Sequence, residues 1–235
     1  MRNELYQYFQ LSTDLGLLQR QWSSQSGPYA RSMIHGRSVR CLSIDEFEAL
    51  ISFVGSANNN IKRNTKMLRS LCAHFPHNLV AHVDGGMVYC FPTLDEVATL
   101  SVDDLEEMGW GYRAGRVVSL CSELSSMGGL SWLKQLRDSA LEDATQRLMM
   151  LSGVGPKVAD CIALFGLGHH SAVPLDNRVA KMHRYNGPYE QLKQQFQNKY
   201  GIVFCSSVLT DACVGIYAGW AAIGMFASEY LDLVV

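Results

Sequence analysis

The stretch Leu151-Ser-Gly-Val-Gly-Pro-Lys-Val-Ala-Asp160 places a glycine turn between two segments of helical character. Apolar residues recur at helical spacing before the turn, over 141–151, and again after it, over 158–165. The pattern therefore predicts a helix–hairpin–helix, with the hairpin at 151–159. Backbone N–H groups at the start of the second helix have no partner within that helix, so they suit a phosphate group.

Two residues in and beyond this hairpin could carry covalent chemistry. Lys157 opens the second helix, where the helix dipole and partial burial favour the free amine, and a free amine can attack a sugar carbon. Asp176 ends the sequence Val173-Pro-Leu-Asp. Taken singly, a solvated surface lysine and a helix N-cap are the simpler interpretations. Together the two residues suggest DNA held by its backbone while a nucleophile acts on a sugar.

The composition gives no bulk signature of nucleic-acid binding. The 235 residues carry a formal net charge of −2, and 48% of them are hydrophobic, which is enough for one large domain or two small lobes. A DNA-binding face must then come from local segregation of charge. Residues 56–83 contain four Lys or Arg and no acid, whereas acids cluster over 95–107. Solvated helix faces remain the alternative for both segments.

The cysteines predict neither disulfides nor a metal centre. There are seven, an odd number, at scattered positions and without a C-x-x-C pair. We interpret them as reduced thiols of an intracellular protein. The sequence predicts no cofactor and no metal ligands, and no apolar run reaches the length of a membrane span.

The fold class that follows is all-α, with two helical lobes and the hairpin at a cleft between them. We expect a central lobe over about 44–148, and a second lobe made of 1–43 and 149–235. Strand signals are confined to 79–83 and 87–91, which could pair across a turn at Asp84-Gly85-Gly86.

Four further blocks flank the hairpin in a fixed order: Tyr8–Leu11, Ser52–Ile61, Gly109–Ala114 and Tyr217–Trp220. With them the chain resembles, over nearly its whole length, the helix–hairpin–helix DNA glycosylases that carry the Gly/Pro-Asp signature. Within that superfamily it looks most like the eukaryotic-type 8-oxoguanine glycosylase/lyases.

The resemblance implies a base-excision repair enzyme that removes 8-oxoguanine opposite cytosine and then cuts the strand. Lys157 would displace the base and form a Schiff base with the sugar, and β-elimination would follow. Asp176 would stabilise the positive charge on the sugar and help Lys157 to lose its proton. The implied partner is double-stranded DNA with a damaged purine. The resemblance also implies a monomer without membrane attachment and a nuclear location.

It further implies residues that hold and open the duplex. Asn58 would fill the space left by the flipped base, Tyr112 would wedge beside the orphan cytosine, and two arginines would bond to that cytosine. Backbone amides of the hairpin and a further arginine would bind phosphate. For single residues a helix cap or surface charge is the ordinary interpretation, although three consecutive Asn are of no use to a core helix. The arginines and hairpin residues are Arg63, Arg113, Arg178, Gly153, Val154 and Gly155.

The base pocket implied by the resemblance uses three residues. Cys161 and Phe226 would sandwich the flipped base, and Glu229 stands where the family commonly has an acid. Cys161 follows Lys157 by one helical turn, on the same helix face. Core packing is the alternative interpretation for the cysteine and the phenylalanine.

Three departures from the family pattern leave other functions open. Arg178 and Ala222 replace an expected histidine and glutamine, and the family's N-terminal mixed α/β domain is expected to be absent because its Tyr-Phe-Gln-Leu segment begins at Tyr8. A glycosylase/lyase with a shifted lesion preference is one alternative. A truncated, non-catalytic damaged-DNA-binding protein is another, and an all-α protein without DNA affinity is a third.

Overall fold

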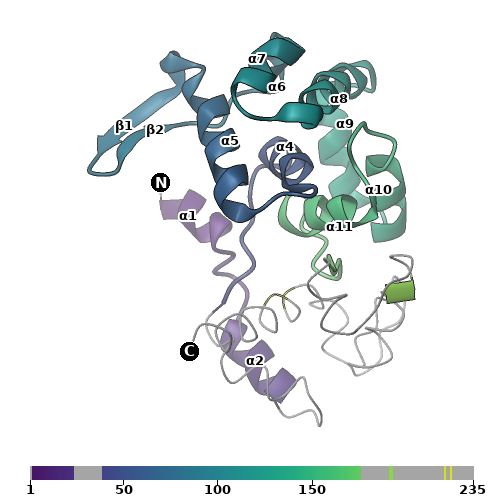
Figure 1. Cartoon of the computed structure of the whole chain (residues 1–235). Coiled ribbons are helices and arrows are strands. Elements are labelled where there is room, and N and C mark those ends of the chain that lie inside the picture. Colours follow the sequence, from purple (N-terminus) through teal and green to yellow (C-terminus); the bar gives the residue numbers. More distant parts are fainter. Residues whose placement is uncertain (1, 24–38, 176–190, 193–219, 221–222, 224–235) are drawn as a thin grey trace. The chain divides into compact units, whose positions relative to one another are not determined.

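The computed structural model describes residues 2–23, 39–175, 191–192, 220 and 223, and α-helices dominate this part of the chain (Figure 1). The all-α prediction is confirmed, with one pair of short strands in the described part. None of the helices described there is both long enough and apolar enough to cross a membrane.

The chain divides into two compact units. The first unit comprises Met1–Ile44, Ala140–Glu142 and Ala163–Val235, and the second comprises Asp45–Ser139 and Asp143–Ile162. The hairpin at 151–159 falls in the second unit. The lobe bounds expected from sequence stay a prediction.

The first unit begins with α1 (Arg2–Tyr8) and α2 (Leu15–Ser23). The turn between them is tied to the segment that precedes the second unit. Arg40 donates from Nη1 to the carbonyl oxygens of Gln10 and Thr13 at 3.0 and 3.2 Å, and the N–H of Ser43 donates to the Tyr8 carbonyl at 2.9 Å. These bonds fix residues 8–13 against residues 40–43.

The second unit is built around one buried helix, α4 (Glu46–Ser56). In Figure 1 this helix lies between α5 and α11. Its Leu50, Ile51 and Val54 side chains are buried, and each such residue contributes about 1.5–3 kcal/mol of hydrophobic stabilisation. Asp45 caps its first turn by accepting from the N–H groups of Phe47 and Glu48.

The other helices of the unit pack around α4 and end at short turns. Buried apolar residues on α8 and α11 complete the core. The elements, in chain order, are α5 (Ile61–Ala73), η1 (Pro76–Asn78), α6 (Leu94–Ala98), α7 (Val102–Glu107), η2 (Gly111–Arg113), α8 (Ala114–Ser126), α9 (Gly129–Gln135), η3 (Leu136–Asp138), α10 (Leu141–Leu148) and α11 (Pro156–Phe165).

A buried carboxylate joins the start of α4 to α9 and η3. Glu46 is almost fully buried, and it accepts from Arg137 Nη2 at 2.7 Å, with Lys134 Nζ at 3.7 Å. A buried acid is stable only when such partners neutralise it. This pair therefore fixes the direction in which α4 enters the core.

The predicted strand pair is confirmed as β1 (Leu79–Val83) and β2 (Gly86–Tyr89), which run antiparallel. The second strand ends earlier than expected, because its partner β1 is preceded directly by the 3₁₀ turn η1 and offers no further strand residue. One bond extends the pairing beyond Tyr89, from the N–H of Cys90 to the Asn78 carbonyl at 2.8 Å. Most residues of the pair are exposed, and Figure 1 shows the ribbon projecting from the helices of its unit.

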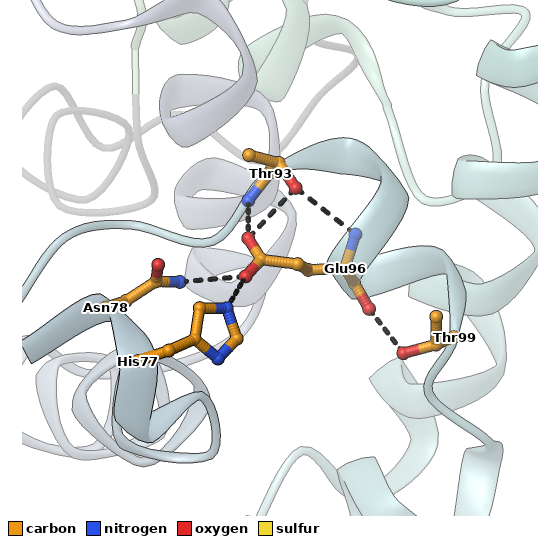
Figure 2. Close-up of polar contacts among 5 residues, drawn as sticks. All are labelled: His77, Asn78, Thr93, Glu96 and Thr99. Carbon is orange, nitrogen blue, oxygen red and sulfur yellow. Dashed lines mark hydrogen bonds and ion pairs between the residues drawn. The ribbon is translucent and has the colours of Figure 1, made fainter.

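One carboxylate anchors the base of this ribbon to α6 (Figure 2). Glu96 accepts from the N–H and hydroxyl of Thr93, which caps α6, and from Asn78 Nδ2 and the ring of His77. The backbone hydrogen bond from Thr93 is the largest cause of a shift that lowers the pKa of Glu96 to about 2.

Candidate active site

The hairpin turn depends on a glycine that no other residue can replace without strain. Gly153 has φ +85°, a left-handed conformation that favours glycine. A Cβ atom there would also lie 3.2 Å from Val54 Cγ1 and 3.3 Å from Arg116 Cβ. By contrast, a Cβ added to Gly155 would meet nothing within 4 Å. The first glycine is thus required by the fold, while the second faces open space.

The three hairpin amides differ in what they offer to a phosphate. The N–H of Val154 donates to the Leu151 carbonyl at 3.1 Å and closes the turn. The N–H groups of Gly153 and Gly155 have no partner among the residues that the structure describes. Gly155 accepts from the N–H of Ala159 and so starts α11, with Pro156 in its first turn. Gly153 and Gly155 therefore offer the N–H groups that remain available to an anion.

A carboxylate on α8 holds the residue directly before Gly153. Ser152 donates its backbone N–H to Glu123 Oε2 at 2.7 Å and its hydroxyl to Glu123 Oε1 at 2.6 Å. Glu123 lies on α8, as does Arg116, which packs on Gly153. Helix α8 thus contacts two successive residues of the hairpin.

Lys157 is the second residue of α11 and is half-buried. Its Nζ lies 5.9 Å from the centroid of the Phe53 ring on α4. This is the outer limit of a cation–π contact, and such contacts are worth about 0.5–1 kcal/mol at exposed sites. Phe53 therefore lies beside the predicted nucleophile. The predicted partner Asp176 lies outside the described residues.

The structure brings together three of the residues predicted to open the duplex. Asn58 follows α4 in a left-handed conformation with φ +48°, and its side chain is exposed. Arg113 Nη2 donates to the carbonyl oxygens of Ala57 and Asn58 at 2.6 and 2.8 Å. The Tyr112 hydroxyl also donates to the Ala57 carbonyl, at 3.2 Å. The loop that presents Asn58 is thus held by both neighbours from η2.

Arg113 is buried, with 1% of its surface exposed, and burial is the main cause that lowers the pKa of its guanidinium. Its Nη1 atom is buried and has no hydrogen-bond partner in the described part of the chain. A charged group in such a place normally has all its donors satisfied. Nη1 therefore keeps an unused donor, and the predicted contact with a cytosine would require this buried atom to become accessible.

Tyr112 presents an exposed ring flanked by charge. The residue is 54% exposed, and the guanidinium carbons of Arg113 and Arg116 lie 4.3 and 5.0 Å from its ring centroid. Arg63, on α5, donates from Nη2 to the Gly109 carbonyl at 3.1 Å, just ahead of this turn. The four residues Asn58, Arg63, Tyr112 and Arg113 therefore converge on one region of the second unit.

Of the predicted base-pocket residues, the structure describes one. Cys161 lies on α11 one turn after Lys157 and is 3% exposed. Phe226, Glu229 and the predicted phosphate ligand Arg178 lie outside the described residues.

Sequence reasoning missed three residues of this region. Phe53 belongs to the quoted Ser52–Ile61 block, so a closer look at that block could have found it. Glu123 and Arg116 lie on α8, about 30 residues before the hairpin that they contact. No local pattern relates α8 to the hairpin.

Comparisons with known proteins point to DNA glycosylases. Residues 1–50, which include Tyr8–Leu11, match a family model described as the N-terminal domain of 8-oxoguanine DNA glycosylase. An N-glycosylase/DNA lyase of Saccharomyces cerevisiae is 31% identical over 97% of this chain and 66% of its own length. One from Arabidopsis thaliana is 34% identical over 96% of this chain and 61% of its own length. The chain thus spans less than two thirds of the length of these relatives.

Solved structures share the fold. The 8-oxoguanine glycosylase/lyase of Clostridium acetobutylicum, in complex with double-stranded DNA containing cytosine opposite 8-oxoguanine, is 26% identical with a TM-score of 0.80. That match covers 99% of this chain and 75% of the other. A 3-methyladenine DNA glycosylase of Archaeoglobus fulgidus has a TM-score of 0.71 at 16% identity, over 100% of this chain and 75% of its own, which shows the fold alone.

Proposed function

Because this chain belongs to the helix–hairpin–helix DNA glycosylases of the 8-oxoguanine glycosylase/lyase type, we propose that it removes 8-oxoguanine opposite cytosine and cuts the DNA strand at the resulting site. The observation that carries this proposal is the position of Lys157. It stands in the first turn of α11, directly after the Gly153–Gly155 turn, with its amine beside Phe53.

The proposed reaction begins at the sugar of the damaged nucleotide. The neutral amine of Lys157 attacks C1′, and the glycosidic bond breaks so that the base leaves with that electron pair and a proton. Asp176 stabilises the positive charge that develops on the sugar. One proton of the attacking amine goes to the departing base and the other goes to the ring oxygen O4′ as the sugar ring opens, which gives a Schiff base between Lys157 and C1′.

Strand cleavage follows from that Schiff base. Loss of a proton from C2′ lets the C3′–O bond break, so the 3′ phosphate leaves and the strand is cut by β-elimination. Water then hydrolyses the Schiff base and releases Lys157. This chain's residues supply the nucleophile, the carboxylate and the positioning of the sugar, and the reaction requires no redox partner.

The duplex must be held and opened for this chemistry. The N–H groups of Gly153 and Gly155 bind a backbone phosphate near the lesion, with a further phosphate at Arg178. Asn58 enters the stack from its exposed left-handed position, and Tyr112 wedges beside the orphan cytosine. Extruding a base costs about a few kcal/mol, which these contacts offset.

The orphan cytosine is read by Arg63 and Arg113, each of which could discriminate by about 1–3 kcal/mol. The flipped purine lies between Cys161 and Phe226, near Glu229. The protein acts as a monomer, in the nucleus.

Borohydride trapping tests the proposal. The protein is mixed with a duplex that contains 8-oxoguanine opposite cytosine, and the reductant converts any Schiff base into a stable adduct. We expect an adduct with the wild type, none with Lys157→Gln, and a wild-type yield with Lys134→Gln, a lysine on α9 that pairs with Glu46. An equal yield from Lys157→Gln would reject the assigned nucleophile.

A second candidate is a glycosylase/lyase with another lesion preference. Ala222 favours it, because an alanine cannot read the edge of a purine as an amide would. Duplexes with oxidised, alkylated or deaminated bases distinguish the two candidates, and a clear preference for 8-oxoguanine rejects the second. A duplex with a preformed abasic site separates both from a non-catalytic damaged-DNA-binding protein, which would bind it without cutting.

A further inference from the structure

Helix α5 carries a row of exposed cations that has no counter-charge. Lys62, Lys66 and Arg69 are exposed, and no carboxylate in the described residues pairs with any of them. Arg147 on α10, by contrast, pairs with Asp143 at 3.5 Å. The three α5 cations are therefore available to an external anion.

These cations share one face of the helix, which we call the α5 basic face (Lys62, Lys66 and Arg69). Positions i, i+4 and i+7 lie one above another on an α-helix. The face lines a hollow of about 770 Å³, together with the N-cap Asn60 and with Arg63. Helix α5 contains no acid. The surface is thus uniformly positive along its length.

The dimensions of the face fit a nucleic-acid backbone. A rise of about 1.5 Å per residue separates Lys62 from Arg69 by about 10 Å along the helix. One strand of B-DNA carries a charge every 3.4 Å or so of its axis, so this length spans about three phosphates. Lys66 lies between the two ends. Such a row of point charges on flexible stems suits a repeated phosphate better than one small anion.

The face is also continuous with the region that would open the duplex. Arg63, at the edge of the same hollow, bonds to the Gly109 carbonyl, three residues before Tyr112. We propose that the α5 basic face binds the sugar-phosphate backbone of duplex DNA beside the lesion. This inference rests on the proposed function, which places Tyr112 against the orphan cytosine.

The salt dependence of DNA binding tests the inference. The probe is a fluorescent duplex with a tetrahydrofuran abasic analogue opposite cytosine, which the enzyme cannot cut. Its Kd is measured between about 50 and 200 mM salt for the wild type, for Lys66→Gln/Arg69→Gln and for the control Arg147→Gln. Each phosphate contact contributes a slope of about −0.9 in log affinity against log salt.

We expect the slope of the double variant to be smaller in magnitude than that of the wild type by about 2. The fourfold rise in salt should therefore weaken DNA binding by the double variant about tenfold less than it weakens binding by the wild type. Arg147→Gln keeps the wild-type slope. A double variant with the wild-type slope and Kd would overturn the inference, and so would a wild type that does not bind the duplex. If the wild type binds the probe but cuts no lesion, the proposed activity is rejected. The inference about the α5 basic face is still decided by the salt dependence of binding.

Discussion

Ser152 donates both its backbone N–H and its hydroxyl to the two carboxylate oxygens of Glu123, at 2.7 and 2.6 Å. The serine comes directly before Gly153, whose conformation shapes the hairpin. The bidentate contact joins α8 to a turn that lies 29 residues away in the sequence. It places the hairpin, and with it the start of α11, at a defined position on the second unit.

Glu123→Gln should loosen this hairpin. One oxygen of the carboxylate becomes an NH₂ group that cannot accept, so one partly buried donor of Ser152 is left unpaired, at a cost of about 1–3 kcal/mol in the free energy of unfolding. Urea denaturation measures the loss. Ser152→Ala removes the hydroxyl bond alone and should cost about 1 kcal/mol.

Ser122→Ala is the matched control on the exposed side of α8 and should stay within about 0.5 kcal/mol of the wild type. In a double-mutant cycle the effects of Glu123→Gln and Ser152→Ala should not add, because the two residues share one contact. Strict additivity would show that the carboxylate stabilises the protein by some other route.

The two hairpin glycines should respond differently to alanine. Gly153→Ala forces a left-handed residue against Val54 and Arg116, which should cost about 1–3 kcal/mol and lower the Tm. Gly155→Ala meets nothing within 4 Å and should leave the Tm near its wild-type value. It should nevertheless weaken binding to the abasic duplex, because its methyl group enters the space proposed for a phosphate. Unchanged affinity in Gly155→Ala would argue against a phosphate at that amide.

Phe53→Leu should slow the chemistry of Lys157. The substitution keeps an apolar side chain on α4 but removes the ring that lies beside Nζ. The ring also limits where the amine can lie, and we expect the loss of that positioning to outweigh the small gain in free amine that loss of the cation–π contact brings. A barrier higher by about 0.5–1 kcal/mol corresponds to a rate loss of about two- to fivefold. The rate of borohydride-trapped adduct formation at saturating enzyme measures this loss, and an unchanged Kd for the abasic duplex shows that binding is not its cause. An undiminished rate would mean that the ring does not position the amine.

Glu96 should make the protein sensitive to acid. The pKa of Glu96 is lowered from 4.5 to about 2 by hydrogen bonds, of which the one from the Thr93 backbone is largest. Because the folded-state pKa lies below the ordinary one, the stabilisation is fully present above about pH 4.5 and is lost as the pH falls toward 2. Glu96→Gln should therefore show less loss of stability than the wild type across this window.

Chemical denaturation at a series of pH values between about 5 and about 2 checks the Glu96 prediction. Thr93→Ala is the matched variant, because it removes the hydroxyl donor and keeps the backbone N–H. It should lie between the wild type and Glu96→Gln. Identical pH profiles for the wild type and Glu96→Gln would contradict the prediction.

The sequence predicted those features that local signals control. The glycine turn at 151–159 predicted the hairpin because a left-handed backbone conformation, such as that of Gly153, favours glycine. The strand pair was predicted for the same reason, from a turn signal between two short apolar runs. The early end of β2 at Tyr89 was not predicted, since it depends on the η1 turn that precedes the partner strand.

Contacts between distant segments left no such signal. The resemblance implied a DNA contact for Arg113, but no pattern indicated that this side chain is buried beside Asn58 and bonds to the carbonyls of Ala57 and Asn58. The pairing of Glu123 with Ser152 has no periodicity that a sequence could display. Such pairs are set by how α8 packs in the second unit, which only the structure describes.

The last turn of α4 and the residue after it set the spacing of three contacts in the site. Phe53 lies beside Lys157, Val54 packs at the Gly153 turn, and the Ala57 carbonyl receives Arg113. Each residue of an α-helix advances the chain by about 100° around the axis. Inserting or deleting a single residue here would turn these contacts away from their partners, however conservative the inserted side chain. The length of this segment is therefore under stricter constraint than its composition, and relatives should differ here by replacement and never by gaps.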